Sequence, residues 1–153
     1  LDIQAENSGK LVSKVKDEAK KIASTQLKPY IIVDGPPGIG CPVVSSLAGA
    51  NFVLLVTEPT VSGFHDLKRI GGLLQRFRLK AGCIINKWDI NPEITTTIKQ
   101  FLKEENIEHL ADLDFDKGFT YAMVEGLTIV ETENSMGKRI HQVWKTLQER
   151  LSN

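Results

Sequence analysis

Tyr30-Ile-Ile-Val-Asp-Gly-Pro-Pro-Gly-Ile-Gly40 is the stretch on which the predicted fold of this chain depends. An apolar run ends in Asp34, and a turn rich in Gly and Pro follows at once. Because the run does not alternate apolar and polar residues, it predicts a strand over 30–34 with both faces covered, as in a parallel sheet. Taken alone, the stretch is equally compatible with a nucleotide site and with a plain buried strand that turns tightly into a helix.

The nucleotide interpretation gives two residues of this stretch a chemical role. An aspartate at the end of such a strand corresponds to a Walker B element, whose carboxylate holds Mg²⁺, usually through water. The turn over 35–38 would then sense the terminal phosphate, since a glycine at 38 lets a backbone N–H approach phosphate with no Cβ in the way. Asp34 and Gly38 are therefore the predicted catalytic residues, and Asp34 is the predicted metal residue.

The composition is that of an ordinary globular domain. Of 153 residues, 41% are apolar and 25% are charged, and 19 basic residues balance 19 acidic ones. This balance gives no indication of nucleic acid or an anionic membrane as a partner. No apolar run approaches the roughly 20 residues of a membrane helix. Two cysteines, Cys41 and Cys83, fit a reducing cytoplasm better than a disulfide scaffold.

Helices and apolar strands alternate along the rest of the chain. Strands are expected over 52–57 and 81–86, with a fourth strand ending at Leu113, and extended segments over 1–7 and 127–131. Helices are expected over about 8–24, 42–48, 62–77, 92–105, 118–126 and 135–151, with Ser8, Ser62 and Asn91 as N-caps. This alternation predicts an α/β fold, a doubly wound and mostly parallel sheet with helices on both faces, whose ligands bind at the carboxyl ends of the strands.

A second motif, Asn86-Lys87-Trp88-Asp89, follows the strand over 81–86 directly. Its form is Asn-Lys-x-Asp, in which GTPases use the aspartate to bind guanine while the asparagine and lysine support the loop. A four-residue motif of this kind also occurs by chance as a solvated turn. Its position after a strand, two strands beyond the Walker B-like one, favours a nucleotide contact.

Three segments in the same order resemble the MinD/ParA superfamily of P-loop ATPases. They are Asp34–Leu47, Val56–Arg69 and Ile85–Asp89, and the resemblance is strongest to the branch with an inserted ferredoxin (4Fe-4S) domain. Glu6–Val12 resembles the segment that resumes the ATPase domain after that insert. The resemblance covers nearly the whole chain.

This resemblance implies an ATP-dependent switch in which two protomers sandwich ATP and Mg²⁺. Asp34 would be the magnesium-associated acid, Gly38 the phosphate-sensing glycine and Asn86 the contact to the base. Lys87 and Asp89 belong to the same nucleotide-binding loop. The implied partners are a second copy of the chain and an iron–sulfur or redox protein. Neither nucleic acid nor a membrane is expected as a partner. The expected location is the cytoplasm.

The segment after the fourth strand normally closes over adenine in this superfamily. Relatives carry Ile-Pro-aromatic-Asp there, and this chain has Leu113-Asp114-Phe115-Asp116. Phe115 and Asp116 are thus predicted nucleotide contacts. Asp114 stands where the superfamily usually has proline, so this chain departs from the family pattern on the base side.

The Walker A loop of this superfamily and the cysteines of the 4Fe-4S clusters do not occur in these residues. The chain begins at Leu1 and its first methionine is Met123, so residues 1–153 are expected to be the C-terminal portion of a single P-loop ATPase domain. Such a portion is not expected to hydrolyse ATP by itself, and loss of the Walker A strand would leave an apolar strand edge unpaired. Two other functions stay open: a GTPase-like switch that uses Asn86–Asp89, and a non-catalytic scaffold.

Overall fold

The computed structural model describes residues 3–152, which divide into two units. One unit contains the described residues up to Ala50 together with Arg69–Leu79. The other contains Asn51–Lys68 and the described residues from Lys80 onward. Helix α3 (Val61–Phe77) contributes residues to both units.

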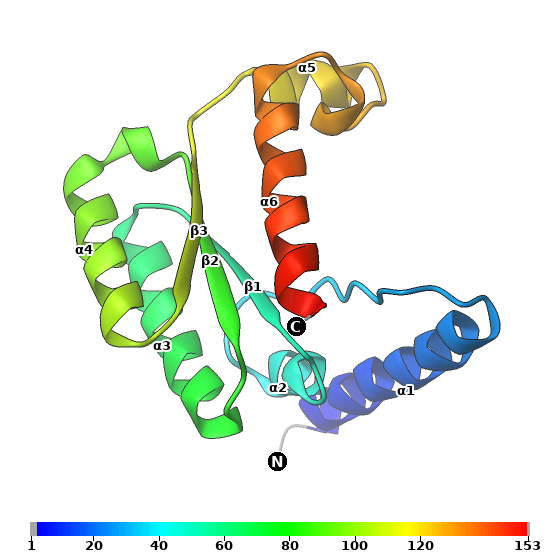
Figure 1. Ribbon diagram of the computed structural model, residues 1–153. Helices are drawn as coiled ribbons and strands as arrows, with labels where there is room; N and C mark the ends of the chain where they lie inside the picture. Colours follow the sequence, from blue (N-terminus) through cyan, green and yellow to red (C-terminus); the bar gives the residue numbers. More distant parts are fainter. Residues whose placement is uncertain (1–2, 153) are drawn as a thin grey trace. The chain divides into compact units, whose positions relative to one another are not determined.

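The second unit is built on a three-stranded parallel sheet (Figure 1). Its strands are β1 (Val53–Thr57), β2 (Ala81–Asn86) and β3 (Glu108–Leu113), in the order β1-β2-β3. The central strand β2 is buried from Ala81 to Ile85, as expected for an apolar strand covered on both faces. The α/β fold with a parallel sheet, predicted from the alternation of apolar segments, is confirmed.

Helices cover both faces of this sheet (Figure 1). Helix α4 (Pro92–Glu104) lies on one face together with the first half of α3, where the rings of Phe64 and Phe101 meet edge to face at 5.6 Å. Helix α6 (Ser135–Leu151) lies on the opposite face. The predicted N-cap of α4 is confirmed, because the side chain of Asn91 accepts a hydrogen bond from the backbone N–H of Ile94.

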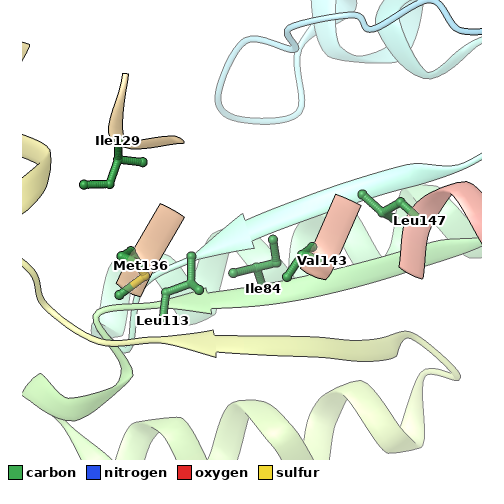
Figure 2. Packing of buried hydrophobic residues seen from close by; sticks show 6 residues of the cluster. All are labelled: Ile84, Leu113, Ile129, Met136, Val143 and Leu147. Atoms are coloured by element: carbon green, nitrogen blue, oxygen red, sulfur yellow. The ribbon is translucent and has the colours of Figure 1, made fainter. Parts of the chain in front are cut away.

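A cluster of apolar side chains joins α6 to the sheet (Figure 2). Ile84 and Leu113 come from the strands, whereas α6 contributes Met136, Val143 and Leu147. The cluster also includes Ile129 of the 3₁₀ helix η2 (Ile129–Glu131).

Two ion pairs hold α6 to β3 at both ends of the strand. Glu108 at the start of β3 binds Arg150 in the last turn of α6, with an Nη2–Oε1 distance of 2.7 Å. Asp114, just beyond the end of β3, binds Arg139 near the start of α6. These pairs tie the helix along the length of the strand.

The segment between β3 and α6 differs in part from the prediction. A short helix is confirmed as α5 (Gly118–Val124), but the extended segment predicted over 127–131 is wrong. The carboxylate of Glu131 accepts hydrogen bonds from the backbone N–H and hydroxyl of Thr128, and this capping box closes the segment into a 3₁₀ turn.

The first unit contains α1 (Ile3–Thr25) and α2 (Cys41–Leu47), which pack against each other. Helix α1 begins earlier than predicted, so the extended segment over 3–7 and the N-cap at Ser8 are wrong; residues 1 and 2 lie outside the described part. The apolar residues that recur at helical spacing on α1 are exposed, with Leu11 at 62% and Val15 at 60%.

The strand predicted over 30–34 is wrong for this structure. Tyr30–Asp34 has irregular backbone, and the side chain of Ile32 is 81% exposed. A strand is stabilised by hydrogen bonds to a neighbour, and no described segment pairs with this one. The Walker B-like sequence is thus present without its strand.

Candidate functional site: the carboxyl edge of the sheet

The candidate site lies in the second unit, where the three parallel strands end. Thr57 pairs in register with Ile85, and Asn86 pairs with Leu113. Because parallel strands end at the same edge, the residues that follow β1, β2 and β3 meet there. These residues are Glu58 and the two nucleotide motifs predicted from the sequence.

Glu58 organises the start of the Asn86–Asp89 motif. Its Oε1 accepts a hydrogen bond from Asn86 Nδ2 at 3.4 Å and lies 2.7 Å from Lys87 Nζ. Lys87 has a left-handed backbone (φ 53°), which turns the chain sharply as it leaves β2. Sequence reasoning missed Glu58 as a site residue, and its position directly after β1 was the available signal.

The loop after β1 is also fixed by close packing against the first turn of α3. Thr60 Oγ1 accepts a hydrogen bond from the N–H of Gly63, so Thr60 caps α3 and the predicted cap at Ser62 is wrong. A Cβ on Gly63 would lie 2.5 Å from the carbonyl oxygen of Glu58. Glycine is therefore required where the helix meets the loop that carries Glu58.

The loop after β2 and the loop after β3 are joined by side-chain hydrogen bonds. Asp89 Oδ1 accepts from the backbone N–H of Phe115 at 2.8 Å. The indole N–H of Trp88 donates to Asp114 Oδ1. The structure thus brings together both predicted motifs, and it uses Asp89 to hold the second one.

Asp114 has a further partner in α6. Its Oδ2 accepts from Arg139 Nη1, and Arg139 Nη2 donates to the backbone carbonyl of Asp112. The hydrogen bond from Trp88, together with the guanidinium of Arg139, lowers the pKa of Asp114 below its usual value. Sequence reasoning missed Arg139, which lies 25 residues away and carries no motif.

Phe115 and Asp116 occupy different environments in the loop after β3. The ring of Phe115 is 53% exposed, so it offers a free aromatic surface beside the carboxyl edge. The carboxylate of Asp116 accepts from the backbone N–H of Gly118 at 2.6 Å and so caps the approach to α5. Phe115 is thus available to a ligand, whereas one oxygen of Asp116 is engaged.

A polar cluster lies beside Trp88. Asp112 accepts from Lys99 of α4 and pairs with His109 Nε2 at 2.8 Å. The ammonium of Lys99 also lies 5.9 Å from the centre of the Trp88 ring, a cation–π distance. The hydroxyl of Thr95 donates to the backbone carbonyl of Trp88 at 2.9 Å. Trp88 is therefore held on several sides.

The two predicted catalytic residues, Asp34 and Gly38, belong to the first unit. Asp34 is exposed on the irregular segment, and Gly38 has a positive φ of 88° with open space where a Cβ would stand. Such a glycine can present its backbone N–H to an anion. A single exposed carboxylate also fits Mg²⁺, which protein sites hold through one or two carboxylates together with phosphates.

Lys16 fixes helix α2, which follows the Gly-Pro turn. Its ammonium donates to the backbone carbonyls of Ser45, Ser46 and Ala48 at 3.1, 2.7 and 2.6 Å. Partial burial, with the nearby charge of Lys20, lowers the pKa of Lys16. A cation at these carbonyls satisfies acceptors that a helix C-terminus otherwise leaves open.

The residues present do not fit an iron–sulfur cluster in this chain. A 4Fe-4S cluster needs four thiolates, and the chain has two cysteines, an exposed Cys41 and a buried Cys83. Burial raises the pKa of the Cys83 thiol to about 12. Within residues 3–152, no three His, Cys, Asp or Glu side chains form a group that could hold a metal ion.

The sequence relatives of this chain are longer than the chain itself. No model of a known protein family matches the sequence. An uncharacterized protein of Methanocaldococcus jannaschii is 27% identical over 149 residues, which are 97% of this chain and 49% of that protein. The septum site-determining protein MinD of Synechocystis is 30% identical over 110 residues, 71% of this chain and 37% of that protein. The chain therefore spans about half or less of the length of these relatives.

Solved structures share the same fold. A chain of the MinC:MinD cell division complex of Aquifex aeolicus superposes with a TM-score of 0.72 at 20% identity, over 90% of this chain and 59% of that chain. The septum site-determining protein MinD of Pyrococcus horikoshii, complexed with Mg-ADP, gives 0.65 at 21% identity, over 80% of this chain and 53% of that chain. Part of the chain is similar in sequence to septum site-determining proteins MinD. It shares their α/β fold over the part that it covers, as the sequence motifs implied. None of the helices between residues 3 and 152 is long and apolar enough to cross a membrane.

Proposed function

We propose that this chain is the C-terminal portion of a MinD-type ATPase domain and supplies one part of an ATP site. The carrying observation is that Asn86, Lys87 and Phe115 meet at the carboxyl edge of a parallel sheet, in a relative of MinD. Asn86 would bind the base through its amide, and the exposed ring of Phe115 would pack on it. The Walker A loop would come from another part of a longer polypeptide.

Asp34 and Gly38 would contact the Mg²⁺ and the phosphates of the nucleotide. Asp34 would hold Mg²⁺ through water, and the backbone N–H of Gly38 would approach the terminal phosphate. The bound Mg²⁺ would neutralise charge on the phosphates. The exposure of Asp34 and the open, positive-φ backbone of Gly38 are compatible with these roles.

The outer edge of β1 supports the proposal of a longer domain. Among the described residues β1 pairs with β2 alone, and on that strand Leu54 is 41% and Val56 is 63% exposed. An apolar strand edge in this state favours pairing with a further strand. The Walker A strand of the complete domain would supply that partner.

The finer family assignment is a proposal of the same kind. Glu6–Val12 resembles the segment that follows a ferredoxin insert, which favours a switch protein linked to 4Fe-4S clusters and to metal–sulfur or redox metabolism. The clusters would lie in the insert, since this chain lacks the thiolates. A homodimer that sandwiches ATP, a redox protein partner and a cytoplasmic location follow from the same resemblance.

Guanine is a weaker candidate than adenine for the base. Recognition of guanine by Asn-Lys-x-Asp requires the aspartate to accept from two donors of the base. In this chain Asp89 Oδ1 already accepts from the backbone N–H of Phe115. This contact favours a structural role for Asp89.

A non-catalytic scaffold has one observation in its favour. The short helix α5 exposes large apolar side chains, among them Tyr121 at 66%, Met123 at 71% and Val124 at 80%. Exposed apolar groups of this kind are typical of protein contacts. Absence of ATP binding in the complete protein would leave the scaffold as the better interpretation.

The test is nucleotide binding and hydrolysis by the complete protein, compared with this 153-residue chain. We expect the complete protein to bind ATP more tightly than GTP and to hydrolyse it, while the chain alone does neither at micromolar ATP. Asp34→Asn should abolish most Mg²⁺-dependent hydrolysis. Asp17→Asn, which removes an exposed carboxylate of α1, is the matched control and should not. Full hydrolysis by Asp34→Asn would overturn the assignment.

A further inference from the structure

Asp114 stands at the meeting point of three elements of the second unit. One carboxylate oxygen accepts from the indole N–H of Trp88 in η1 (Trp88–Ile90), and the other accepts from Arg139 of α6. Both oxygens of this half-exposed side chain thus accept hydrogen bonds, one from a residue before Asp114 in the sequence and one from a residue after it. Arg139 also binds the carbonyl of Asp112, which fixes the guanidinium against the end of β3.

These contacts lie next to the residues that would bind the base. Phe115 directly follows Asp114, and its N–H is bound by Asp89, which directly follows Trp88. Asn86 lies two residues before Trp88. The hydrogen bonds therefore set the separation of the loop after β2 from the loop after β3.

We propose that Trp88, Asp114 and Arg139 form a loop clasp that positions the base-binding loops and couples them to α6. The inference rests on the proposed ATP site and adds to it three positioning residues that are not among the predicted site residues. Asp114 supplies two carboxylate oxygens, one to the indole N–H of Trp88 and one to the guanidinium of Arg139, and the second of these is a charge-assisted hydrogen bond. Its action on the base is indirect, through Phe115 and Asn86.

The chain provides a matched control at the other end of β3. Glu108 and Arg150 form a second carboxylate–guanidinium pair between β3 and α6, with Nε–Oε distances of 3.2 and 3.1 Å. This pair joins the same two elements but lies away from the carboxyl edge. A general loosening of α6 would follow from losing either pair, whereas an effect on the base-binding loops should follow only from losing the clasp.

The first measurement follows Trp88 directly, without nucleotide. The chain has two tryptophans, so Trp144→Phe leaves Trp88 as the only indole emitter. In that background we expect Asp114→Ala to shift the Trp88 emission to longer wavelength as the ring loses its partner and gains solvent. Glu108→Gln should leave the emission unchanged. An unchanged spectrum in Asp114→Ala would show that the clasp does not hold Trp88.

The second measurement uses ATP hydrolysis by the complete protein. Because the loops contact the base equally in the ground state and the transition state, Asp114→Ala and Arg139→Met should raise KM for ATP about tenfold with kcat nearly unchanged. Inhibition by inorganic tripolyphosphate, which has no base, should not change. Trp88→Phe keeps the ring without the donor and should show a smaller rise in KM.

The outcomes separate the clasp from the site itself. If the wild-type protein binds ATP and the Asp114→Ala variant has the same KM for ATP, the clasp is overturned. The proposed function is unaffected by that result. Equal losses for ATP and tripolyphosphate, or a similar loss in Glu108→Gln, indicate a global defect and also overturn it. A wild-type protein that binds no ATP overturns the proposed function, and the role of the clasp in that site falls with it.

Discussion

Replacing Val56 by Lys should have opposite effects on this chain alone and on the complete domain. Val56 lies on the outer strand β1, and its side chain is 63% exposed. In the 153-residue chain this exposed apolar edge favours edge-to-edge pairing between copies, which a lysine discourages. In a complete domain a further strand beside β1, together with the layer packed on the extended sheet, would cover the same side chain, so that lysine would have to be buried.

The magnitude follows from the exposed fraction. Full burial of a Val or Leu side chain contributes roughly 1.5–3 kcal/mol, so covering the exposed part of Val56 contributes about 1–2 kcal/mol. Val56→Lys should thus lower the free energy of unfolding of the complete domain by at least about 1–2 kcal/mol, plus the cost of desolvating the ammonium. In the chain alone, the change in unfolding free energy should stay within about 0.5 kcal/mol, since the site is exposed.

Two assays on each protein distinguish these effects. Size-exclusion chromatography with light scattering measures self-association of the chain, and urea unfolding measures the stability of both forms. Val124→Lys is the control, because Val124 is 80% exposed on α5 and lies outside the sheet edge. If Val56→Lys leaves the complete domain as stable as Val124→Lys does, β1 is not covered there and the proposal of an additional strand is refuted.

Three further predictions concern single interactions. Lys16→Met should remove about 1 kcal/mol of local stability from the contact between α1 and α2, since three carbonyls lose their donor. The α2 amides should then exchange hydrogen faster, and unchanged exchange would contradict the prediction. The hydrogen bond from Arg150 lowers the pKa of Glu108 below its usual value, so this pair stabilises the fold above that usual value, and the contribution is lost as pH falls through the lowered pKa. Glu108→Gln should therefore reduce the urea midpoint at pH 7 but not near pH 2, and an equal deficit at both pH values would contradict this sign. Asp89→Ala should weaken ATP and GTP binding to the same extent by releasing Phe115, whereas a loss confined to GTP would support guanine recognition.

Local sequence signals predicted most elements of the second unit. The apolar runs that became β1 and β2 have both the length and the composition of buried parallel strands. Asn91-Pro92 predicted the start of α4 because an N-cap side chain and a proline at the first helical position act within one turn. Such signals depend on neighbours in sequence, which is why they could be interpreted without a structure.

The contacts that build the candidate site are of another kind. Asp114 meets Trp88 across 26 residues and Arg139 across 25, and no periodicity in the sequence marks these pairs. The partners of Asp114 follow only from the packing of α6 along β3. The motifs thus predicted which loops matter, while the tertiary fold determines what holds them.

The exposed stripe of α1 shows a second limit of pattern reasoning. Leu11, Val15 and Ile22 repeat at helical spacing, and the helix they predicted is present. The same residues are 55–62% exposed, because periodicity identifies an apolar face without supplying a surface to cover it. Helix formation and burial are therefore separate predictions.

Both limits apply to Tyr30–Asp34, the stretch on which the fold prediction depended. Its sequence predicts a strand, but it does not supply the neighbour that a strand needs. Ile31, Ile32 and Val33 are β-branched residues with strong strand preference, yet a strand needs hydrogen bonds from a neighbour. No described segment provides them, so the backbone is irregular and the apolar side chains face solvent. The outer edge of β1 has the complementary defect, a formed strand whose second side is unpaired among the described residues. Pairing with a further strand would remedy either defect, since a strand is stabilised by hydrogen bonds to its neighbours. The Walker B-like aspartate would then stand at the end of a strand, where the chemistry proposed for it requires it to be.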